Sequence, residues 1–204
     1  MQSPDAERSL SEIDLDPDPH RQFHKWFQEA IAAGEPMPGA MALATVSQDG
    51  LPSVRMMQLE DVDERGITFQ TNLDSPKAHH LAGLPRAAVA VFWPLLLRQV
   101  RVTGSIGALT RDEVRAYHNR LPPGVHAMLQ ACRQSQVIAD RAELEALYAA
   151  AMKEPADGVP KDWGGYRLRV ETIEFWQGRP NWLQDRMRYT RTDDGAWRIE
   201  RLVP

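Results

Sequence analysis

The sequence predicts a mainly β fold, an antiparallel, barrel-like sheet with peripheral helices. Segments with the apolar pattern of strands dominate the 204 residues and follow one another along the chain, and helical patterns are inserted between them. This order favours an antiparallel sheet over a doubly wound parallel one. No GxGxxG or GxxxxGKS/T pattern occurs, so the sequence supports neither a Rossmann nor a P-loop nucleotide site.

The composition is that of an ordinary globular chain, with 43% hydrophobic and 25% charged residues. A formal net charge of -4 argues against a nucleic-acid-binding protein, because such proteins usually carry a basic surplus. The longest apolar run, 87–97, is too short to cross a bilayer. A single cysteine and an acidic N-terminus without an apolar segment predict a cytoplasmic protein. We expect a polar arm at 1–18 and one domain at 19–204.

The first elements of the domain are one helix, three strands and a short helix. Apolar residues recur with helical spacing over 19–33, and Gly34 provides a stop signal. Three strands are then predicted as a meander, with Asp49-Gly50 marking the first hairpin turn. Ser75 as N-cap and Pro76 at the first helical position predict the short helix. The ranges after the first helix are 40–46, 51–60, 67–72 and 75–83.

The second half alternates between strands and helices in the same way. Gly104 and Gly107 predict bends or bulges in the second of two long strands. Two capping boxes, Thr110 with Glu113 and Asp140 with Glu143, predict two helices. The predicted order is strands 86–93 and 97–109, helix 111–120, loop 121–126, helix 140–152, linker 153–163, and strands 165–170, 172–177, 186–192 and 196–202.

Several polar side chains interrupt segments that are otherwise apolar and read as strands. Outward alternation on a strand explains any one of them. Together, however, guanidinium, ammonium and hydroxyl groups suit a phosphate monoester, and amide side chains suit the pyrimidine edge of a flavin. The residues concerned are Arg55, Gln99, Arg101, Gln134, Ser135, Arg186 and Arg188.

A set of motifs in fixed order resembles the pyridoxamine 5′-phosphate oxidase family, which are FMN-dependent flavoenzymes of split-barrel fold. The resemblance extends from about residue 19 to the C-terminus. It implies an antiparallel split β-barrel, a homodimer, and two FMN sites built between the subunits. The motifs are SVRMMQLE (53–60), FQTN with SPK (69–77), WPLLLRQVRV (93–102), RQSQVI (133–138), WGGYRL (163–168), EFWQGRPNWLQDR (174–186) and WRIERLVP (197–204).

The resemblance also implies which residues bind FMN. Arg55 and Lys77 match cations that bind the FMN phosphate region, although Pro76 replaces a second cation beside Lys77. Gln70 departs from the family's Tyr at that position, and Thr71 matches the residue that follows it. The full set implied as cofactor-binding is Arg55, Met56, Gln70, Thr71, Lys77, Gln99, Gln134, Ser135, Trp176 and Arg186.

The residues that match the family's substrate site depart from its pattern. Glu60 stands where a Lys holds the substrate phosphate, and a carboxylate near a phosphate is repulsive. Tyr117 is kept, but Leu121 and Val125 replace an Arg and a Ser, unless Arg120 fills the Arg position by a one-residue shift. Near the C-terminus an Arg-x-His pair becomes Trp182 and Gln184. The expected substrate-binding residues are Glu60, Tyr117, Trp182 and Gln184.

The resemblance and its departures predict an FMN-dependent oxidoreductase. We expect hydride transfer from a substrate other than pyridoxamine or pyridoxine phosphate, with oxygen reoxidising FMN to give hydrogen peroxide. Trp182 is able to stack on a flat substrate, and capping of the flavin or packing in the dimer are equal alternatives for it. One alternative is a weak but genuine pyridoxamine/pyridoxine 5′-phosphate oxidase, and another is a non-catalytic flavin carrier or sensor. The expected partners are a second copy of the chain and a small-molecule substrate. No catalytic side chain, metal site, nucleic acid or membrane partner is predicted.

Overall fold

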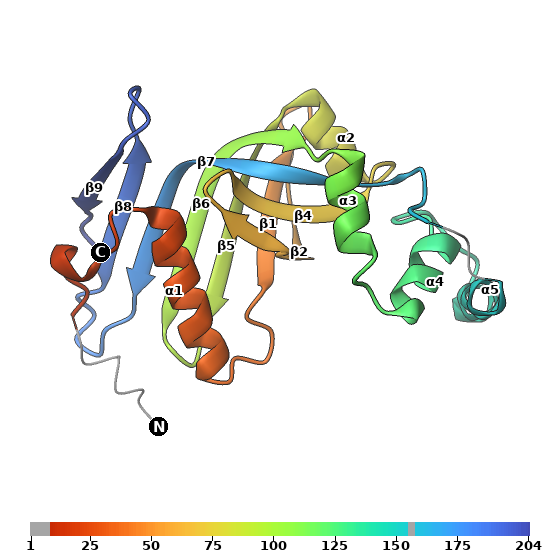
Figure 1. Cartoon of the computed structure of the whole chain (residues 1–204), viewed down its shortest axis with the longest axis horizontal. Coiled ribbons are helices and arrows are strands. Elements are labelled where there is room, and N and C mark those ends of the chain that lie inside the picture. The colour runs from red at the N-terminus through yellow and green to blue at the C-terminus, as the bar shows by residue number, and fades with distance from the viewer. Residues whose placement is uncertain (1–8, 155–157) are drawn as a thin grey trace.

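The computed structural model describes residues 9–154 and 158–204, which form one nine-stranded sheet with helices around it (Figure 1). Every strand pairing is antiparallel, which confirms the predicted fold class. The strands are β1 (Ala40–Val46), β2 (Pro52–Gln58), β3 (Asp61–Asp63), β4 (Gly66–Asn72), β5 (Arg86–Trp93), β6 (Arg98–Ala108), β7 (Trp163–Gln177), β8 (Asp185–Arg191) and β9 (Trp197–Arg201).

The helices lie at the edges and on one face of this sheet (Figure 1). Helix α1 packs across the sheet, whereas α4 and α5 form a lobe at the end of the molecule opposite β8 and β9. The helices are η2 (Glu12–Asp14), α1 (Pro19–Ala32), α2 (Pro76–Gly83), α3 (Arg111–His118), α4 (Pro123–Ala131) and α5 (Arg141–Lys153). Strands β8 and β9 extend the sheet away from the barrel.

Strand β7 divides the sheet in two. Its first half pairs with β4 and its second half with β8, while β6 runs along both halves. The register of β6 shifts between Thr103 and Gly104, as the glycine predicted. A Cβ on Gly104 would stand 1.8 Å from the carbonyl oxygen of Arg169, so only glycine fits this crossing. The bulge therefore lies where β7 passes from the barrel to the β8–β9 extension.

The core lies between α1 and the sheet. Trp26 and Phe23 point from α1 onto the strands, where Trp26 meets Phe175 edge to face with ring centroids 5.1 Å apart. Phe23 meets Trp93 in the same way at 5.9 Å. All four rings are almost fully buried, and aromatic side chains contribute large apolar areas of this kind to cores. The helix begins at Pro19, with Asp18 as its N-cap.

Three predictions about the strands are wrong. The first three strands do not form a meander, because β2 pairs with β1 whereas β4 pairs with β3 and β7. The two strands predicted at 165–170 and 172–177 are the single long strand β7. The segment CRQSQV (132–137), read as strand-like, forms no strand: Gln134 and Ser135 lie in a turn, and Ser135 has a φ of 69°. Alternation shows which segments are extended but carries no information on which strand lies beside which.

The loop predicted at 121–126 contains the start of an unpredicted helix, α4. Pro123 occupies its first turn, a position that proline favours, and Ala127 and Leu129 are buried. The two prolines and Gly124 read as loop signals in the sequence, but here they mark a helix start.

The described part of the expected polar arm packs against the C-terminal strands. Arg201 donates to the carbonyl oxygen of Leu10 at 2.8 Å, and the Tyr189 hydroxyl donates to that of Asp16 at the same distance. Leu15 joins the core. Residues 1–8 of the predicted arm lie outside the described residues. In the described parts of the chain, no helix is both long and apolar enough to span a membrane.

Candidate functional site

Lys77 is the centre of a buried polar cluster. Its Nζ donates to Thr71 Oγ1 at 3.0 Å and to Gln134 Oε1 at 2.8 Å. The Thr71 hydroxyl also donates to Gln134 Oε1, at 3.0 Å. Thr71 comes from β4, Lys77 from the first turn of α2 and Gln134 from the segment after α4. The structure therefore brings together three predicted cofactor residues from distant parts of the sequence.

Arg55 approaches the same place from β2. Its guanidinium donates to Thr45 Oγ1 and Ser53 Oγ, each at 2.8 Å, and to the Leu43 carbonyl oxygen at 3.1 Å. These contacts hold the side chain along the strand. The groove between β2 and α2 has a volume of about 360 Å³ and is lined by Ser53, Val54, Arg55, Met56, Met57, Pro76, Lys77, Gln134 and Ser135.

The groove carries positive charge without a counter-charge. Burial, together with the charge of Arg55, lowers the pKa of Lys77 to about 8, and burial also lowers the pKa of Arg55. Among the described residues no carboxylate lies within ion-pairing distance of either cation. An anion entering the groove would relieve this repulsion. Two cations with hydroxyl donors beside them fit the phosphate monoester of a flavin mononucleotide.

A second group of predicted residues lies in one row across three strands. Gln99 on β6 pairs with Trp176 on β7, and Trp176 pairs with Arg186 on β8, so all three share one face of the sheet. Arg186 makes two hydrogen bonds to Glu174, of 2.9 and 3.1 Å, and a third to the Val203 carbonyl oxygen. The Glu174 carboxylate raises the pKa of Arg186. The row's one positive charge, on Arg186, is thus already paired with Glu174 within the chain.

Met56 does not join the Lys77 cluster through its side chain. Successive strand residues point to opposite faces, so Met56 points away from the face that carries the Arg55 side chain. Its side chain is 65% exposed.

Glu60, Tyr117 and Arg120 form a third group, which we call the Glu60 cluster. Burial raises the pKa of the Glu60 carboxyl to about 8, opposed by the backbone N–H of Gln70, which donates to it, and by the charge of Arg120. The Arg120 guanidinium lies 5.2 Å from the centre of the Tyr117 ring. Burial and the charge of Glu60 raise the pKa of Tyr117. The cation near Glu60 is therefore Arg120, one residue before Leu121.

Trp182 and Gln184 lie far from the Glu60 cluster. They belong to the loop between β7 and β8, and Figure 1 shows β8 at one end of the molecule and α3 on the other side of the barrel. Trp182 is 82% exposed and has a φ of 64°. Gln184 Oε1 accepts a 2.6 Å hydrogen bond from the backbone N–H of Arg179. Within one chain, the four predicted substrate-binding residues therefore lie in two separate places.

Gln70, predicted as a cofactor residue, uses its side chain elsewhere. Its Oε1 accepts a 2.6 Å hydrogen bond from Trp163 Nε1, and its Nε2 donates to the Val114 carbonyl oxygen at 3.2 Å. The amide thus connects β4 with β7 and α3. The WGGYRL motif contains Trp163, but nothing in the sequence indicated this role for it. Thr45 and Ser53, whose hydroxyls accept hydrogen bonds from Arg55, were not predicted either. Ser53 lies two residues before Arg55 on β2, and Thr45 pairs with Ser53 from β1.

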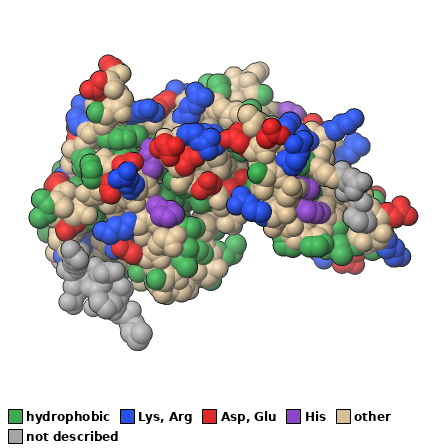
Figure 2. Space-filling model, viewed as in Figure 1, with side chains coloured by type: hydrophobic (Ala, Val, Ile, Leu, Met, Phe, Trp, Pro, Cys, Tyr) green, Lys and Arg blue, Asp and Glu red, His purple; other side chains and the backbone are tan. Residues whose placement is uncertain are grey.

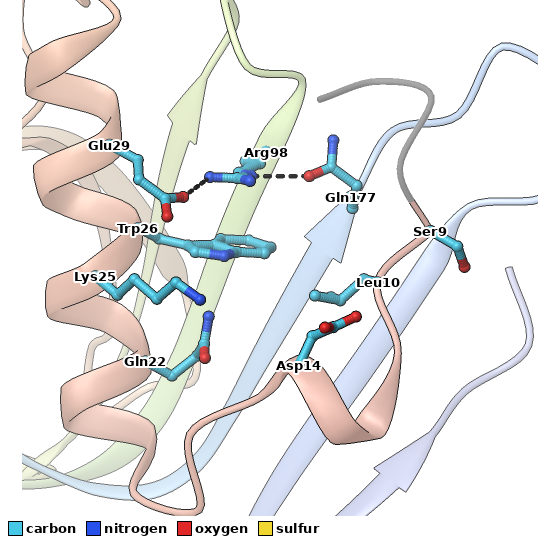
Figure 3. Close-up of a pocket in the computed structure, with 9 residues that line it drawn as sticks. All are labelled: Ser9, Leu10, Asp14, Gln22, Lys25, Trp26, Glu29, Arg98 and Gln177. Atoms are coloured by element: carbon cyan, nitrogen blue, oxygen red, sulfur yellow. Dashed lines mark hydrogen bonds and ion pairs between the residues drawn. The ribbon is translucent and has the colours of Figure 1, made fainter. Parts of the chain in front are cut away.

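A further cavity beside α1 contains none of the predicted site residues (Figure 3). Arg98 pairs with Glu29, donates to Gln177 Oε1 at 2.8 Å, and lies 4.5 Å from the centre of the Trp26 ring. The lining of this cavity carries positive charges from Lys25 and Arg98 and negative charges from Asp14 and Glu29. Arg98 therefore joins α1 to β6 and β7.

The split-barrel fold and the cationic groove define the class of protein, an FMN-binding flavoprotein. Residues 27–153 match the family model for pyridoxamine 5′-phosphate oxidase, and residues 163–204 match that for the pyridoxine 5′-phosphate oxidase C-terminal dimerisation region. The chain belongs to the pyridoxamine 5′-phosphate oxidase family and is an FMN-dependent oxidase. The dimerisation region indicates a homodimer.

Relatives and solved structures agree with this assignment. The pyridoxine/pyridoxamine 5′-phosphate oxidase of Pseudomonas paraeruginosa is 48% identical, covering 96% of this chain and 93% of that protein. Oxidase 1 of Ralstonia nicotianae is 47% identical, with coverage of 98% and 95%. PhzG from Burkholderia lata, solved with tetrahydrophenazine-1-carboxylic acid, superposes with a TM-score of 0.91 at 29% identity, covering 97% and 98%. An FMN-binding protein from Nostoc punctiforme shares the fold, with a TM-score of 0.76 at 18% identity over 97% and 100%.

Proposed function

We propose that this FMN-dependent oxidase acts on a reduced aromatic substrate without a phosphate group. The observation that carries the proposal is the Glu60 cluster, which lies where the family pattern places the substrate phosphate. Arg120 is the cation near Glu60, and the aligned Leu121 and Val125 have no side-chain donors. A raised pKa leaves Glu60 mostly neutral at pH 7, so the loss of cations matters more than repulsion. One guanidinium balances a phosphate dianion poorly.

The flavin phosphate is assigned to the groove of Arg55 and Lys77, with Thr71, Gln134 and Ser135 as further polar contacts. Glu60 follows Arg55 by five residues, about 16 Å of extended chain. The Glu60 cluster is therefore assigned to the substrate and not to the flavin phosphate. When bound, FMN would supply the hydride acceptor for oxidation of the substrate, with oxygen taking up the electrons as hydrogen peroxide.

The partner subunit is proposed to supply the remainder of each site. Gln99, Trp176 and Arg186 lie across β6 to β8. Figure 1 shows β8 well separated from α3, which lies on the side of the lobe of α4 and α5. The surface is hollowed between the barrel and the lobe of α4 and α5, leaving room for a second copy (Figure 2). In this arrangement the Trp182 ring, exposed in the single chain, covers the substrate and excludes water.

The ligand of PhzG supports this choice of substrate. That protein binds tetrahydrophenazine-1-carboxylic acid, a reduced tricyclic ring without phosphate, and its fold matches over nearly the whole chain. Oxidation of pyridoxine or pyridoxamine 5′-phosphate is the second candidate. The names of relatives that are 45–48% identical favour it.

The test is a comparison of reductants under anaerobic conditions. FMN-loaded protein is mixed with tetrahydrophenazine-1-carboxylic acid, pyridoxamine 5′-phosphate or pyridoxine 5′-phosphate, and loss of the oxidised flavin band is followed. We expect fast bleaching by the tricyclic compound and slow bleaching by the phosphates. Air should then restore the band with stoichiometric hydrogen peroxide. Glu60→Lys should speed the reaction with pyridoxamine 5′-phosphate. Faster bleaching of the wild type by either phosphate would establish the second candidate instead.

Subunit complementation tests the shared site. Lys77→Met and Arg186→Gln damage opposite halves, so each homodimer should bind FMN weakly. Dimers that contain one chain of each kind retain one intact site, so random mixing should restore about a quarter of the wild-type sites. A chain that carries both substitutions, mixed with itself, is the control. No recovery in the mixed sample would place both halves within one chain.

A further inference from the structure

The Glu60 cluster is held in place from several directions. The backbone N–H of Glu60 donates to the Thr68 carbonyl oxygen at 3.0 Å, and the Gln70 N–H donates to its carboxyl. Arg120 stacks on Tyr117, which fixes the guanidinium at the end of α3. In the described part of the chain no carboxylate lies within ion-pairing distance of Arg120. The cluster therefore contains a cation, a phenol and a carboxyl group without a tight internal pair.

The charge of the cluster at neutral pH is close to +1. Burial is the largest influence on the Glu60 carboxyl and raises its pKa to about 8, and Asp61 adds to the increase. The Arg120 charge acts in the opposite direction but is outweighed. Glu60 is thus mostly a neutral hydrogen-bond donor at pH 7, beside the Tyr117 hydroxyl and a guanidinium. Three donors and one positive charge suit a monoanion.

We propose that the Glu60 cluster binds a carboxylate group of the substrate, with Arg120 as its counter-charge and Glu60 and Tyr117 as neutral donors. This inference rests on the proposed function, because it names the group that replaces phosphate in that pocket. A phosphate would bring two negative charges against one guanidinium. An ammonium group on the substrate would be repelled by the like charge of Arg120, and it would be favoured only if Glu60 lost its proton.

The proposal has a defined pH dependence. A bound carboxylate stabilises the protonated form of Glu60 and raises its pKa further. Binding is therefore strong below about pH 8 and weakens above it, where the empty site loses its proton and becomes neutral overall. Asp61, Tyr117 and Arg120 are the charged or titratable groups that influence Glu60, and the raised pKa of Tyr117 keeps its phenol protonated in this range.

The experiment measures the binding of two oxidised probes to FMN-loaded protein, phenazine-1-carboxylic acid and phenazine. Neither is a reductant, so binding is read by calorimetry without turnover. We expect the carboxylate to bind at least about tenfold more tightly at pH 7, because hydrogen bonds to charged groups contribute about 1.5–3 kcal/mol. Arg120→Met should abolish this preference. Arg115→Met, on α3 and paired with Asp112, is the matched control.

Glu60→Gln separates proton-linked binding from a structural effect. The amide still donates but does not titrate, so the variant should keep the preference at pH 7 and lose its decline between pH 7 and pH 9. Equal affinity of the wild type for both probes, or an unchanged preference in Arg120→Met, would overturn the proposal. If the flavin is still bleached by reduced tricyclic compounds in that case, only the carboxylate assignment fails. If no phosphate-free compound bleaches it, the proposed function itself fails.

Discussion

Trp163 Nε1 donates a 2.6 Å hydrogen bond to Gln70 Oε1, and the other end of the same amide donates to the Val114 carbonyl oxygen in α3. The backbone N–H of Gln70 reaches the Glu60 carboxyl. One residue thus connects β7 and α3 with the acidic group of the proposed substrate pocket. The position of Tyr117 relative to Glu60 depends on this connection, because α3 carries Tyr117.

Gln70→Leu should destabilise the protein without removing its flavin site. The substitution leaves the Trp163 N–H and the Val114 carbonyl oxygen without their partner, at a cost of about 1–3 kcal/mol in the free energy of unfolding. FMN affinity should change little, since the Gln70 side chain makes no contact with Lys77. Urea unfolding and flavin titration measure the two effects. Gln28→Leu, at an exposed position of α1, is the control. A large loss of FMN affinity at unchanged stability would restore Gln70 as a cofactor ligand.

Lys77→Met should weaken FMN binding by about 10- to 100-fold. The ammonium group is buried in the groove with Thr71 and Gln134, and a charged hydrogen bond to phosphate contributes about 1.5–3 kcal/mol. Quenching of flavin fluorescence on titration with apoprotein gives the dissociation constant. Lys25→Met on α1 should leave it unchanged. Wild-type affinity in Lys77→Met would remove the phosphate from this groove.

FMN affinity should fall as the pH rises above about 8. In the apoprotein the pKa of Lys77 is depressed to about 8, so the amine is charged below that pH and neutral above it. A bound phosphate favours the charged form and raises the pKa, so binding takes up a proton above pH 8 and weakens by up to tenfold per pH unit. Titrations between pH 7 and pH 10 measure this slope. The pH dependence of FMN affinity should be absent in Lys77→Met. If it persists in that variant, a group other than Lys77 causes it.

Gly104→Ala should be far more damaging than Gly107→Ala. The added methyl group at Gly104 would collide with the Arg169 backbone, whereas at Gly107 the nearest atom is the end of a flexible side chain 3.9 Å away. We expect a loss of at least about 3 kcal/mol in the free energy of unfolding at Gly104. At Gly107 the expected change is below about 1 kcal/mol. Thermal and urea unfolding of the two variants, both in β6, provide the comparison, and equal losses would contradict it.

Most secondary-structure elements could be predicted from the sequence because their signals are local. The apolar face of α1, the capping box of Thr110 and Glu113, and the glycine at the β6 bulge each act within a few residues. The pairing of β4 with β7 could not be predicted. It joins residues about a hundred positions apart, and the alternation of neither strand identifies its partner. The helix α4 was missed because its prolines and glycine also suit a loop.

The candidate site was predictable only in part, for a similar reason. Motif resemblance identified Arg55, Thr71, Lys77 and Gln134, and the fold brings them together. It could not reveal that the Gln70 side chain is engaged by Trp163, because that contact forms between two strands. Nor could it fix the loop register that brings Arg120 near Glu60.

The separation of Lys77 from the row of Trp176 and Arg186 has a consequence for the protein at low abundance. If each flavin is held by two subunits, dissociation of the dimer exposes half-sites that retain it poorly, and mass action then couples prosthetic-group occupancy to subunit concentration. On dilution, the fraction of protein with bound flavin would fall more steeply with concentration than it does for a protein whose site lies within one chain. A cell would load this enzyme fully only once enough subunits had accumulated to pair.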